Sequence, residues 1–190
     1  MKEHIQDFDI LCFQELFETG NFRKEHLIDY GIQNRIRYRY LEFYYWAISD
    51  PPSLLSGVPV DGGLAILSRF PILYSKFESY GVGILADCAS DKGSLHCKIL
   101  ANNSVLNIFN THLQATYHNQ IDNQLKVLTI MTRLYQFEKL AERVDRLLKL
   151  QQANDHELVL ITGDLNTDGR KTYFDLDFSK HAAFFVSTDR

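Results

Sequence analysis

The chain has 190 residues, a length that suits one domain with a substantial buried core. Hydrophobic residues make up 45% of it and charged residues 23%, the composition of an ordinary soluble globular protein. The formal charge of −4 gives no broad basic field, which argues against sequence-independent binding to duplex nucleic acid.

The first half of the sequence predicts short strands separated by loops. Apolar runs bounded by polar or turn-forming residues are typical of strands. The stretch 21–32 predicts a helix, because its apolar residues share one face and Gly31 can end it. A loop dense in Pro, Gly and Ser is predicted over 49–63. The expected strands are 9–15, 40–48, 64–68 and a run beginning at Pro71.

A hairpin, a long helix and a last strand are predicted in the second half. The runs 94–100 and 104–112 are separated by an Asn-Asn pair, which indicates a β-hairpin. Over 121–150 apolar residues recur every three or four positions, which predicts a helix with one apolar face. Those apolar positions are Leu125, Leu128, Met131, Leu134, Phe137, Leu140 or Ala141, Val144 and Leu147. With a final strand at 156–164, this order favours an α+β domain with a two-sheet core and flanking helices.

Other classes of protein are not indicated. The three cysteines are too few and too scattered for a disulfide framework or a zinc site. The start of the sequence, MKEHIQDFDI, shows no signal peptide, and no apolar run approaches the roughly 18 residues of a membrane span. We therefore expect an intracellular protein, either cytoplasmic or peripheral at a membrane surface.

Residues able to do chemistry recur where predicted strands end. Glu15 ends the first strand, His112 ends the second strand of the hairpin, and Asp164 with Asn166 ends the last one. Rigid strand ends commonly carry catalytic groups. Each residue also has a plain explanation: a solvated loop start, a structural histidine, or a turn rich in Asp and Asn. Taken singly, none of them decides the function.

Together these residues lie in motifs that resemble the DNase I-like endonuclease/exonuclease/phosphatase superfamily. Four motifs stand in its order and spacing: CFQE (12–15), GGLAILSRFPI (62–72), NTHLQA (110–115) and ITGDLN (161–166). Within it the chain is most similar to neutral sphingomyelinases, through NTHLQATY, SDKGSLHCKI (90–99) and RLYQFEKL (133–140). The resemblance implies a DNase I-like four-layer α/β sandwich, with two packed, mainly antiparallel sheets flanked by helices. Residues 1–190 would form one such domain, incomplete at both ends.

The resemblance also implies an activity, namely Mg²⁺-dependent hydrolysis of sphingomyelin to ceramide and phosphocholine by in-line attack of water. Glu15 would hold the metal, since Mg²⁺ is typically bound by one or two carboxylates plus substrate phosphate. His112 would hydrogen-bond a non-bridging phosphate oxygen and stabilise developing charge. Asp164 would orient or activate the water, and Asn166 would contact the phosphate.

Three further residues are implied near the substrate, each with an alternative. Gln114 would contact the head group or support its neighbours. Lys92 would steady the diester or be a solvated surface lysine. Arg133 shares a helix face with Gln136, in a site-supporting or a surface role.

A phospholipid is the expected partner, and the low positive charge makes nucleic acid less expected. The loop 51–60 carries Leu54 and Leu55, which could dip into a bilayer surface or pack on the domain.

The sequence departs from the superfamily in two places. It lacks the metal-binding Asn of a preceding strand and the Ser-Asp-His motif whose histidine is the usual general base; His181 stands in another context and is expected to be structural. Loss of a general base typically lowers the rate by about 10²- to 10⁴-fold. We therefore expect a fragment of a longer catalytic domain, or else a catalytically dead truncated homologue that serves as a binding module. Another superfamily phosphoesterase, a DNA or RNA endonuclease or a phosphoinositide phosphatase, is the remaining alternative.

Overall fold

The structure is a computed structural model of the whole chain, and it describes residues 8–18, 22–29, 45–50, 58–116, 123–151, 157–167 and 183–184. Two β-sheets form its centre. The first has the strand order β1-β3-β2, and the second the order β4-β5-β6-β7-β8. The strands are β1 (Ile10–Phe13), β2 (Tyr45–Ile48), β3 (Ala65–Ser68), β4 (Ile72–Ser79), β5 (Gly93–Ala101), β6 (Ser104–His112), β7 (Glu157–Asp164) and β8 (Ala183–Phe184).

The pairing between strands is mixed. β1 and β2 both run antiparallel to β3, and β4, β5 and β6 form an antiparallel meander. β7 runs parallel to β6, because the long helix α2 (Asn123–Gln151) returns the chain between them, and β8 is parallel to β7. The predicted hairpin is confirmed, with Asn102 and Asn103 both at positive φ as a tight two-residue turn requires.

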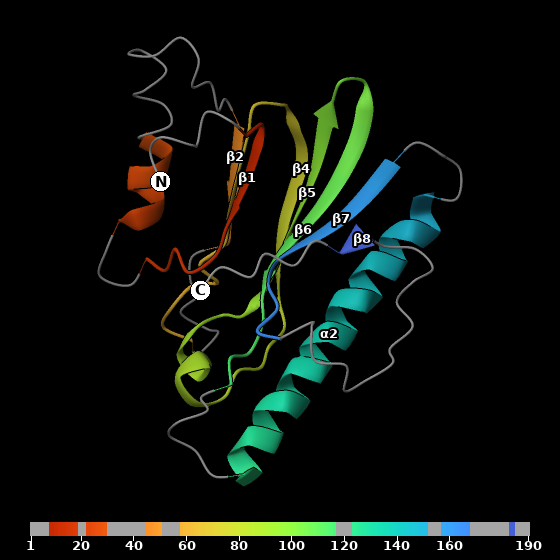
Figure 1. The fold of residues 1–190 in the computed structure, drawn as a ribbon. Coiled ribbons are helices and arrows are strands. Elements are labelled where there is room, and N and C mark those ends of the chain that lie inside the picture. Colours follow the sequence, from red (N-terminus) through yellow and green to blue (C-terminus); the bar gives the residue numbers. More distant parts are fainter. Residues whose placement is uncertain are drawn as a thin grey trace.

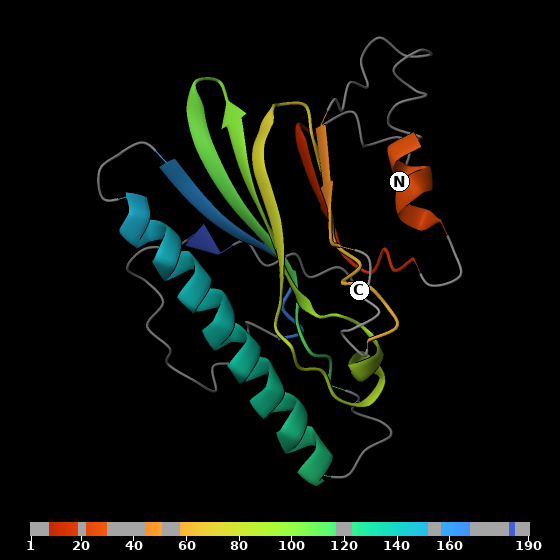
Figure 2. The same ribbon diagram turned by 180° about the vertical axis from the view of Figure 1, so that it is seen from behind.

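Four layers result, as Figures 1 and 2 show from opposite sides. A short helix over 23–29 lies outside the three-stranded sheet, and α2 lies outside the five-stranded sheet. One core cluster fills the space between the sheets, and a second joins the five-stranded sheet to α2. Ile108 belongs to the first and its neighbour Phe109 to the second, as alternation along a strand requires. The α+β sandwich predicted from the sequence is thus confirmed.

The short helix is attached through a buried polar cluster. Lys24 is completely buried and pairs with the buried Asp61. Its ammonium also donates to Ser49 Oγ at 2.9 Å, and Asp61 accepts from the backbone N–H of Gly63 at 3.0 Å. Since a buried charge needs a partner, this cluster holds the outer layer on the sheet.

His96 is a partly buried ionisable group on β5, on the side of the sheet that carries Phe109. Its ring stacks on Phe109 with 4.3 Å between ring centroids, and its Nε2 lies 3.0 Å from Asn107 Oδ1. Burial lowers the pKa of His96, opposed by the hydrogen bond to Asn107 and by the charges of Glu78 and Glu157, and reinforced by Lys98. These surroundings therefore favour the neutral form of His96 at neutral pH.

One expectation for the long helix is wrong. Leu140, Val144 and Leu147 face the sheet as predicted, but Leu128, Met131 and Leu134 are exposed. Polar residues take the inward positions in the first half of α2, because the loops there offer them hydrogen-bond partners. Within the described ranges, no helix combines the length and the apolar character needed to cross a membrane.

Candidate active site

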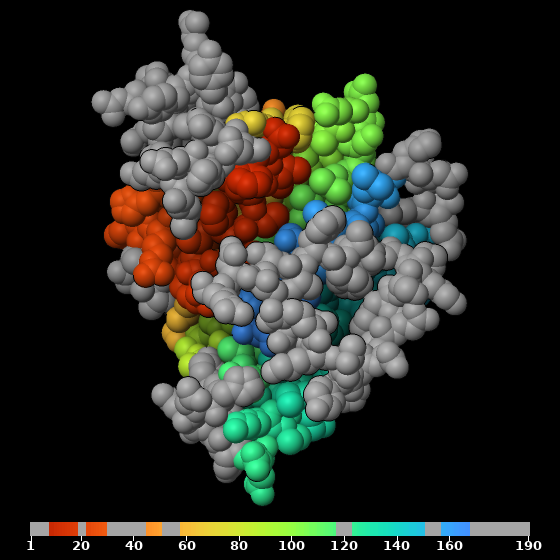
Figure 3. Space-filling model, in the orientation of Figure 1, coloured from red at the N-terminus to blue at the C-terminus, as the bar shows by residue number. Residues whose placement is uncertain are grey.

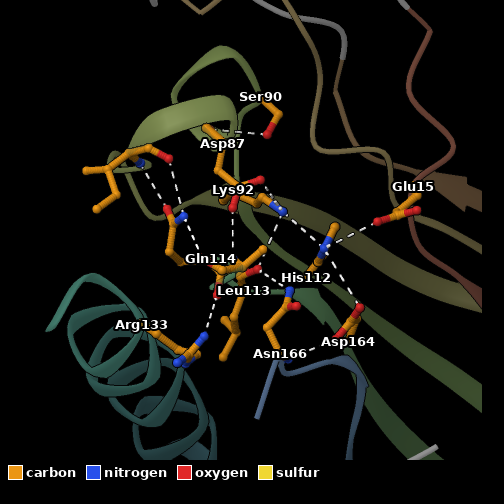
Figure 4. Close-up of polar contacts among 12 residues, drawn as sticks. Glu15, Asp87, Ser90, Lys92, His112, Leu113, Gln114, Arg133, Asp164 and Asn166 are labelled. Carbon is orange, nitrogen blue, oxygen red and sulfur yellow. Dashed lines mark hydrogen bonds and ion pairs between the residues drawn. The ribbon is translucent and has the colours of Figure 1, made fainter. Parts of the chain in front are cut away.

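Four polar residues from three strand ends meet at one end of the sandwich (Figure 4). Glu15 follows β1, His112 ends β6, and Asp164 ends β7 two residues before Asn166. The His112 Nε2 atom lies 3.9 Å from Glu15 Oε1 and 4.0 Å from Asp164 Oδ2. The Asn166 side chain donates to the carbonyl of Leu113 at 2.8 Å. The structure therefore brings together the four residues that the sequence singled out at strand ends.

Asn110 ties the two sheets together behind these residues. Its amide donates to the carbonyl of Phe13 at 2.9 Å and to that of Ala65 at 3.2 Å. Its Oδ1 accepts from Gln14 Nε2 at 2.7 Å. Because Asn110 is fully buried, these bonds fix the end of β1, and with it Glu15, against the end of β6.

A glycine allows β6 and β7 to approach each other closely. Thr111 pairs with Gly163, and His112 pairs with Asp164. Gly163 has φ +132°, and a Cβ atom there would lie 1.9 Å from the carbonyl oxygen of Thr111. Any other residue would force the strands apart, so the glycine before Asp164 sets the distance between the two site side chains.

Two of the site residues have a left-handed backbone. Glu15 has φ 62° and Asn166 has φ 50°. Such conformations cost of the order of 1–3 kcal/mol for a non-glycine residue and gather at functional sites. In both cases the chain turns sharply just after a strand, and the side chain points toward His112 (Figure 4).

His112 is buried and neutral. Burial and the positive charge of Lys92 lower the pKa of His112 to about 4, although Asp164 and Asp87 oppose that shift. The Lys92 ammonium lies 3.0 Å from Nε2, and since an ammonium has only donors, Nε2 accepts this bond. The ring proton then resides on Nδ1, which has no hydrogen-bond partner among the described residues.

Lys92 is a buried cation and not a solvated surface lysine. It is 2% exposed, and besides His112 it contacts Asp87 Oδ1 at 3.1 Å and the carbonyl of Leu113 at 3.4 Å. Burial lowers the pKa of Lys92, and the charge of Asp87 is the main opposing influence. The ammonium thus has three acceptors for its three protons.

Asp87 was missed by sequence reasoning. It lies in the 3₁₀ helix η2 (Leu85–Ala89), and its second oxygen accepts from the backbone N–H of Ala115 at 2.8 Å. Neither strand nor helix periodicity marks such a residue, and the SDKG motif draws attention to Asp91 instead. A buried acid five positions before a buried lysine becomes visible only in three dimensions.

Gln114 supports the site from behind. Its Oε1 accepts from Ile84 N–H at 2.9 Å, and its Nε2 donates to the carbonyl of Ile84 at 3.2 Å. Its own N–H donates to Gln136 Oε1 at 2.7 Å, and Gln136 donates onward to the carbonyl of Val82 at 2.8 Å. Both glutamines are completely buried, so the geometry favours the supporting alternative for Gln114.

Arg133 reaches the same segment from α2. Its Nη1 donates to the carbonyl of Gln114 at 2.8 Å and to Thr116 Oγ1 at 2.9 Å. Burial lowers the pKa of Arg133, while Asp164 raises it. The site-supporting alternative is favoured for Arg133 as well, and contact of Arg133, Gln114 or Lys92 with substrate stays a prediction.

The carboxylates fit a magnesium ion by their chemistry. The Glu15 side chain is 69% exposed and that of Asp164 is 48% exposed, so both offer oxygen atoms next to space for water and phosphate. Mg²⁺ prefers such oxygen ligands and keeps several waters. Among the described residues no group of three or more His, Cys, Asp or Glu side chains is placed to hold a metal ion. A protein site here would thus contribute few ligands.

Two predicted features lie outside the described residues. His181 is one, and most of the loop 51–60, including Leu54 and Leu55, is the other. Val60, at the end of that loop, is held by backbone hydrogen bonds to Ala89 at 3.0 Å and Asp91 at 2.9 Å.

Comparison with known proteins gives a consistent result. The profile of the Endonuclease/Exonuclease/phosphatase family matches residues 1–188. "Sphingomyelinase DDB_G0288017" of Dictyostelium discoideum is 30% identical over 89% of this chain and 39% of its own length. Sphingomyelinase C of Bacillus cereus is 26% identical over 87% of this chain and 48% of its own length.

The fold is shared with solved structures too. Beta toxin from Staphylococcus aureus, in a variant with bound magnesium ions, superposes with a TM-score of 0.65 at 23% identity, covering 86% of this chain and 54% of that one. The chain therefore spans 39% to 54% of the length of these three relatives.

Proposed function

Since the chain belongs to the Endonuclease/Exonuclease/phosphatase family, we propose that it is a magnesium-dependent phosphodiesterase of the sphingomyelinase type. It would hydrolyse sphingomyelin to ceramide and phosphocholine. One observation carries the proposal: a carboxylate oxygen of Glu15 and one of Asp164 both lie close to the same ring nitrogen of His112, at 3.9 and 4.0 Å. The similarity to two sphingomyelinases supports the choice of substrate.

Glu15 would hold the metal through its exposed carboxylate, with water and a phosphate oxygen as further ligands. When bound, the ion would supply Lewis acidity to the phosphoryl group and stabilise the leaving oxygen.

His112 and Lys92 would together meet the phosphoryl group. A neutral imidazole beside an ammonium presents positive potential without a change of protonation. An oxygen of the phosphate that enters beside Nε2 can accept the hydrogen bond that Lys92 now gives to His112. Once Nε2 no longer accepts from Lys92, the neutral ring can lose its proton from Nδ1 to solvent and take one on Nε2, which would then donate to a second non-bridging oxygen.

Asp164 would position the attacking water, and Asn166 would hydrogen-bond the phosphate. The Oδ1 atom of Asp164 accepts from the backbone N–H of Asn166 at 2.8 Å, which leaves Oδ2 to accept from a water molecule. The Asn166 amide uses one of its two N–H groups on the carbonyl of Leu113 and keeps the other for a phosphate oxygen. Attack in line with the leaving oxygen needs a water held in this way.

The test is release of phosphocholine from sphingomyelin vesicles by the 190-residue chain. We expect a requirement for Mg²⁺, loss of activity in Glu15→Gln, and a fall of about 10²- to 10³-fold in kcat for His112→Ala. Glu142→Gln, at an exposed position on α2, is the matched control and keeps full activity.

Three results contradict the proposal. Nicking of plasmid DNA without lipid hydrolysis points to a nuclease of the same family. Release of inorganic phosphate from a phosphoinositide points to a phosphatase. Inactivity on all three substrates, with cooperative unfolding retained, points to a binding module.

A further inference from the structure

The first half of α2 turns its large apolar side chains away from the domain. The exposed positions, each 40% to 60% accessible, are Val127, Leu128, Ile130, Met131, Leu134 and Tyr135. At 3.6 residues per turn they cover an arc of roughly 160° on one side of the helix. We call this set the α2 ridge.

The opposite side of the same turns is polar and faces the domain. Thr129 and Gln136 are completely buried, and Arg133 lies between them with its guanidinium on the carbonyl of Gln114. A helix that only packs on a core buries its apolar side. Here the arrangement is inverted, so packing within the described domain does not account for the ridge.

The second half of α2 shows the usual arrangement. Leu140 and Val144 face inward, while charged residues are exposed on the continuation of the ridge side, namely Glu138, Glu142, Asp145, Arg146 and Lys149. Residues 123–135 contain Lys126 and Arg133 but no Asp or Glu. The outer side of the helix therefore changes along its length from apolar to charged, with residues of both signs.

The ridge lies at the same end of the molecule as the candidate active site. Gln136 and Arg133 hydrogen-bond the backbone of Gln114, two residues after His112. In Figures 1 and 2 the first turns of α2 extend beyond the strand ends, and Figure 3 shows them uncovered at that end. Docking of the ridge on a surface would therefore hold this end of the domain near that surface.

We propose that the α2 ridge docks on the surface of a phospholipid bilayer and presents the active site to the head groups; this rests on the proposed function. A single convex helix with aliphatic tips suits acyl chains, which adapt to its shape, better than it suits a protein pocket. The lack of acidic side chains on residues 123–135 avoids repulsion from lipid phosphates, and the charged outer side of the second half stays in water. The change of character along the helix thus sets how the domain tilts on the membrane.

The test is flotation of the chain with vesicles of sphingomyelin and phosphatidylcholine. The variant Met131→Glu/Leu134→Glu places two charges on the ridge, and we expect it to lower vesicle partitioning by about tenfold or more. Leu150→Glu is the matched control, because Leu150 is 79% exposed on the same helix outside the ridge. It should bind vesicles as the wild type does. All three proteins should unfold at the same denaturant midpoint and hydrolyse the soluble ester p-nitrophenylphosphocholine equally.

The outcomes separate this proposal from the proposed function. Equal vesicle binding by the ridge variant and the wild type overturns the docking surface, as does wild-type hydrolysis of the soluble ester without any vesicle binding. If the wild type elutes as a dimer in gel filtration and the ridge variant elutes as a monomer, the proposal is overturned too, because a second copy of the chain then covers the ridge. Vesicle binding that the ridge variant loses, with no hydrolysis by the wild type, supports the surface and removes the proposed function.

Discussion

Replacement of Gln136 by leucine tests whether α2 holds the loops of the candidate active site in place. Gln136 is completely buried, accepts from the N–H of Gln114 at 2.7 Å and donates to the carbonyl of Val82 at 2.8 Å. Leucine has nearly the same volume, so little cavity forms, but both backbone groups lose their partner.

The magnitude follows from these two lost bonds. Each buried, unsatisfied backbone group costs about 1–3 kcal/mol, or about 2–6 kcal/mol for both. Leucine offsets part of this loss in the free energy of unfolding, because burying an apolar side chain costs less than burying an amide. We expect the free energy of unfolding to fall by about 2–4 kcal/mol, which lowers the urea midpoint by about 1–2 M.

Urea unfolding followed by circular dichroism measures this, with Gln124→Leu as the control. Gln124 is exposed on the same helix, so its replacement should change stability by less than about 0.5 kcal/mol. If Gln136→Leu unfolds at the midpoint of Gln124→Leu, the bridge between α2 and the loops contributes nothing and the reasoning is refuted.

Two further predictions concern stability away from the site. Lys24→Met leaves Asp61 buried without its cation and should lower the free energy of unfolding, measured in urea, by about 3–5 kcal/mol. The control Lys76→Met removes a surface ion pair worth about 0.2–1 kcal/mol, and equal effects of the two variants would contradict the role of the buried pair. The pKa of His96 is lower in the folded protein than its value of about 6.5 in the unfolded chain. As the pH falls through 6.5 the unfolded chain therefore binds more protons than the folded protein, and stability should fall as the pH drops from about 7.5 to about 5.5. The variant His96→Gln should show a shallower fall over that range, and an unchanged slope would count against the assignment.

Much of the fold could be predicted from the sequence, because the signals were local. The Asn-Asn pair marks the hairpin through its tolerance of positive φ, and the alternation in 94–100 marks a strand buried on one side. The motifs also placed Glu15, His112 and Asp164 at strand ends, and the structure brings these three side chains together. Burial of Asn110 and the close approach at Gly163 explain why those motifs contain more than the reactive residues.

What could not be predicted depends on partners distant in the sequence. The spacing in α2 reports an amphipathic helix but not which side faces the domain. Thr129 and Gln136 are buried because loops elsewhere in the chain supply hydrogen bonds. Asp87 was not predicted as a site residue for the same reason, since its role depends on Lys92 and on the backbone of Ala115.

The central claim is that Glu15, His112 and Asp164 form one phosphodiesterase site that depends on magnesium. Phosphocholine release from sphingomyelin, measured against Mg²⁺ concentration for the wild type and Glu15→Gln, tests it most directly. The account predicts that wild-type release rises with Mg²⁺ and saturates, while Glu15→Gln releases none at any concentration used. Equal release by the two proteins, or wild-type release that is unchanged by EDTA, would contradict it.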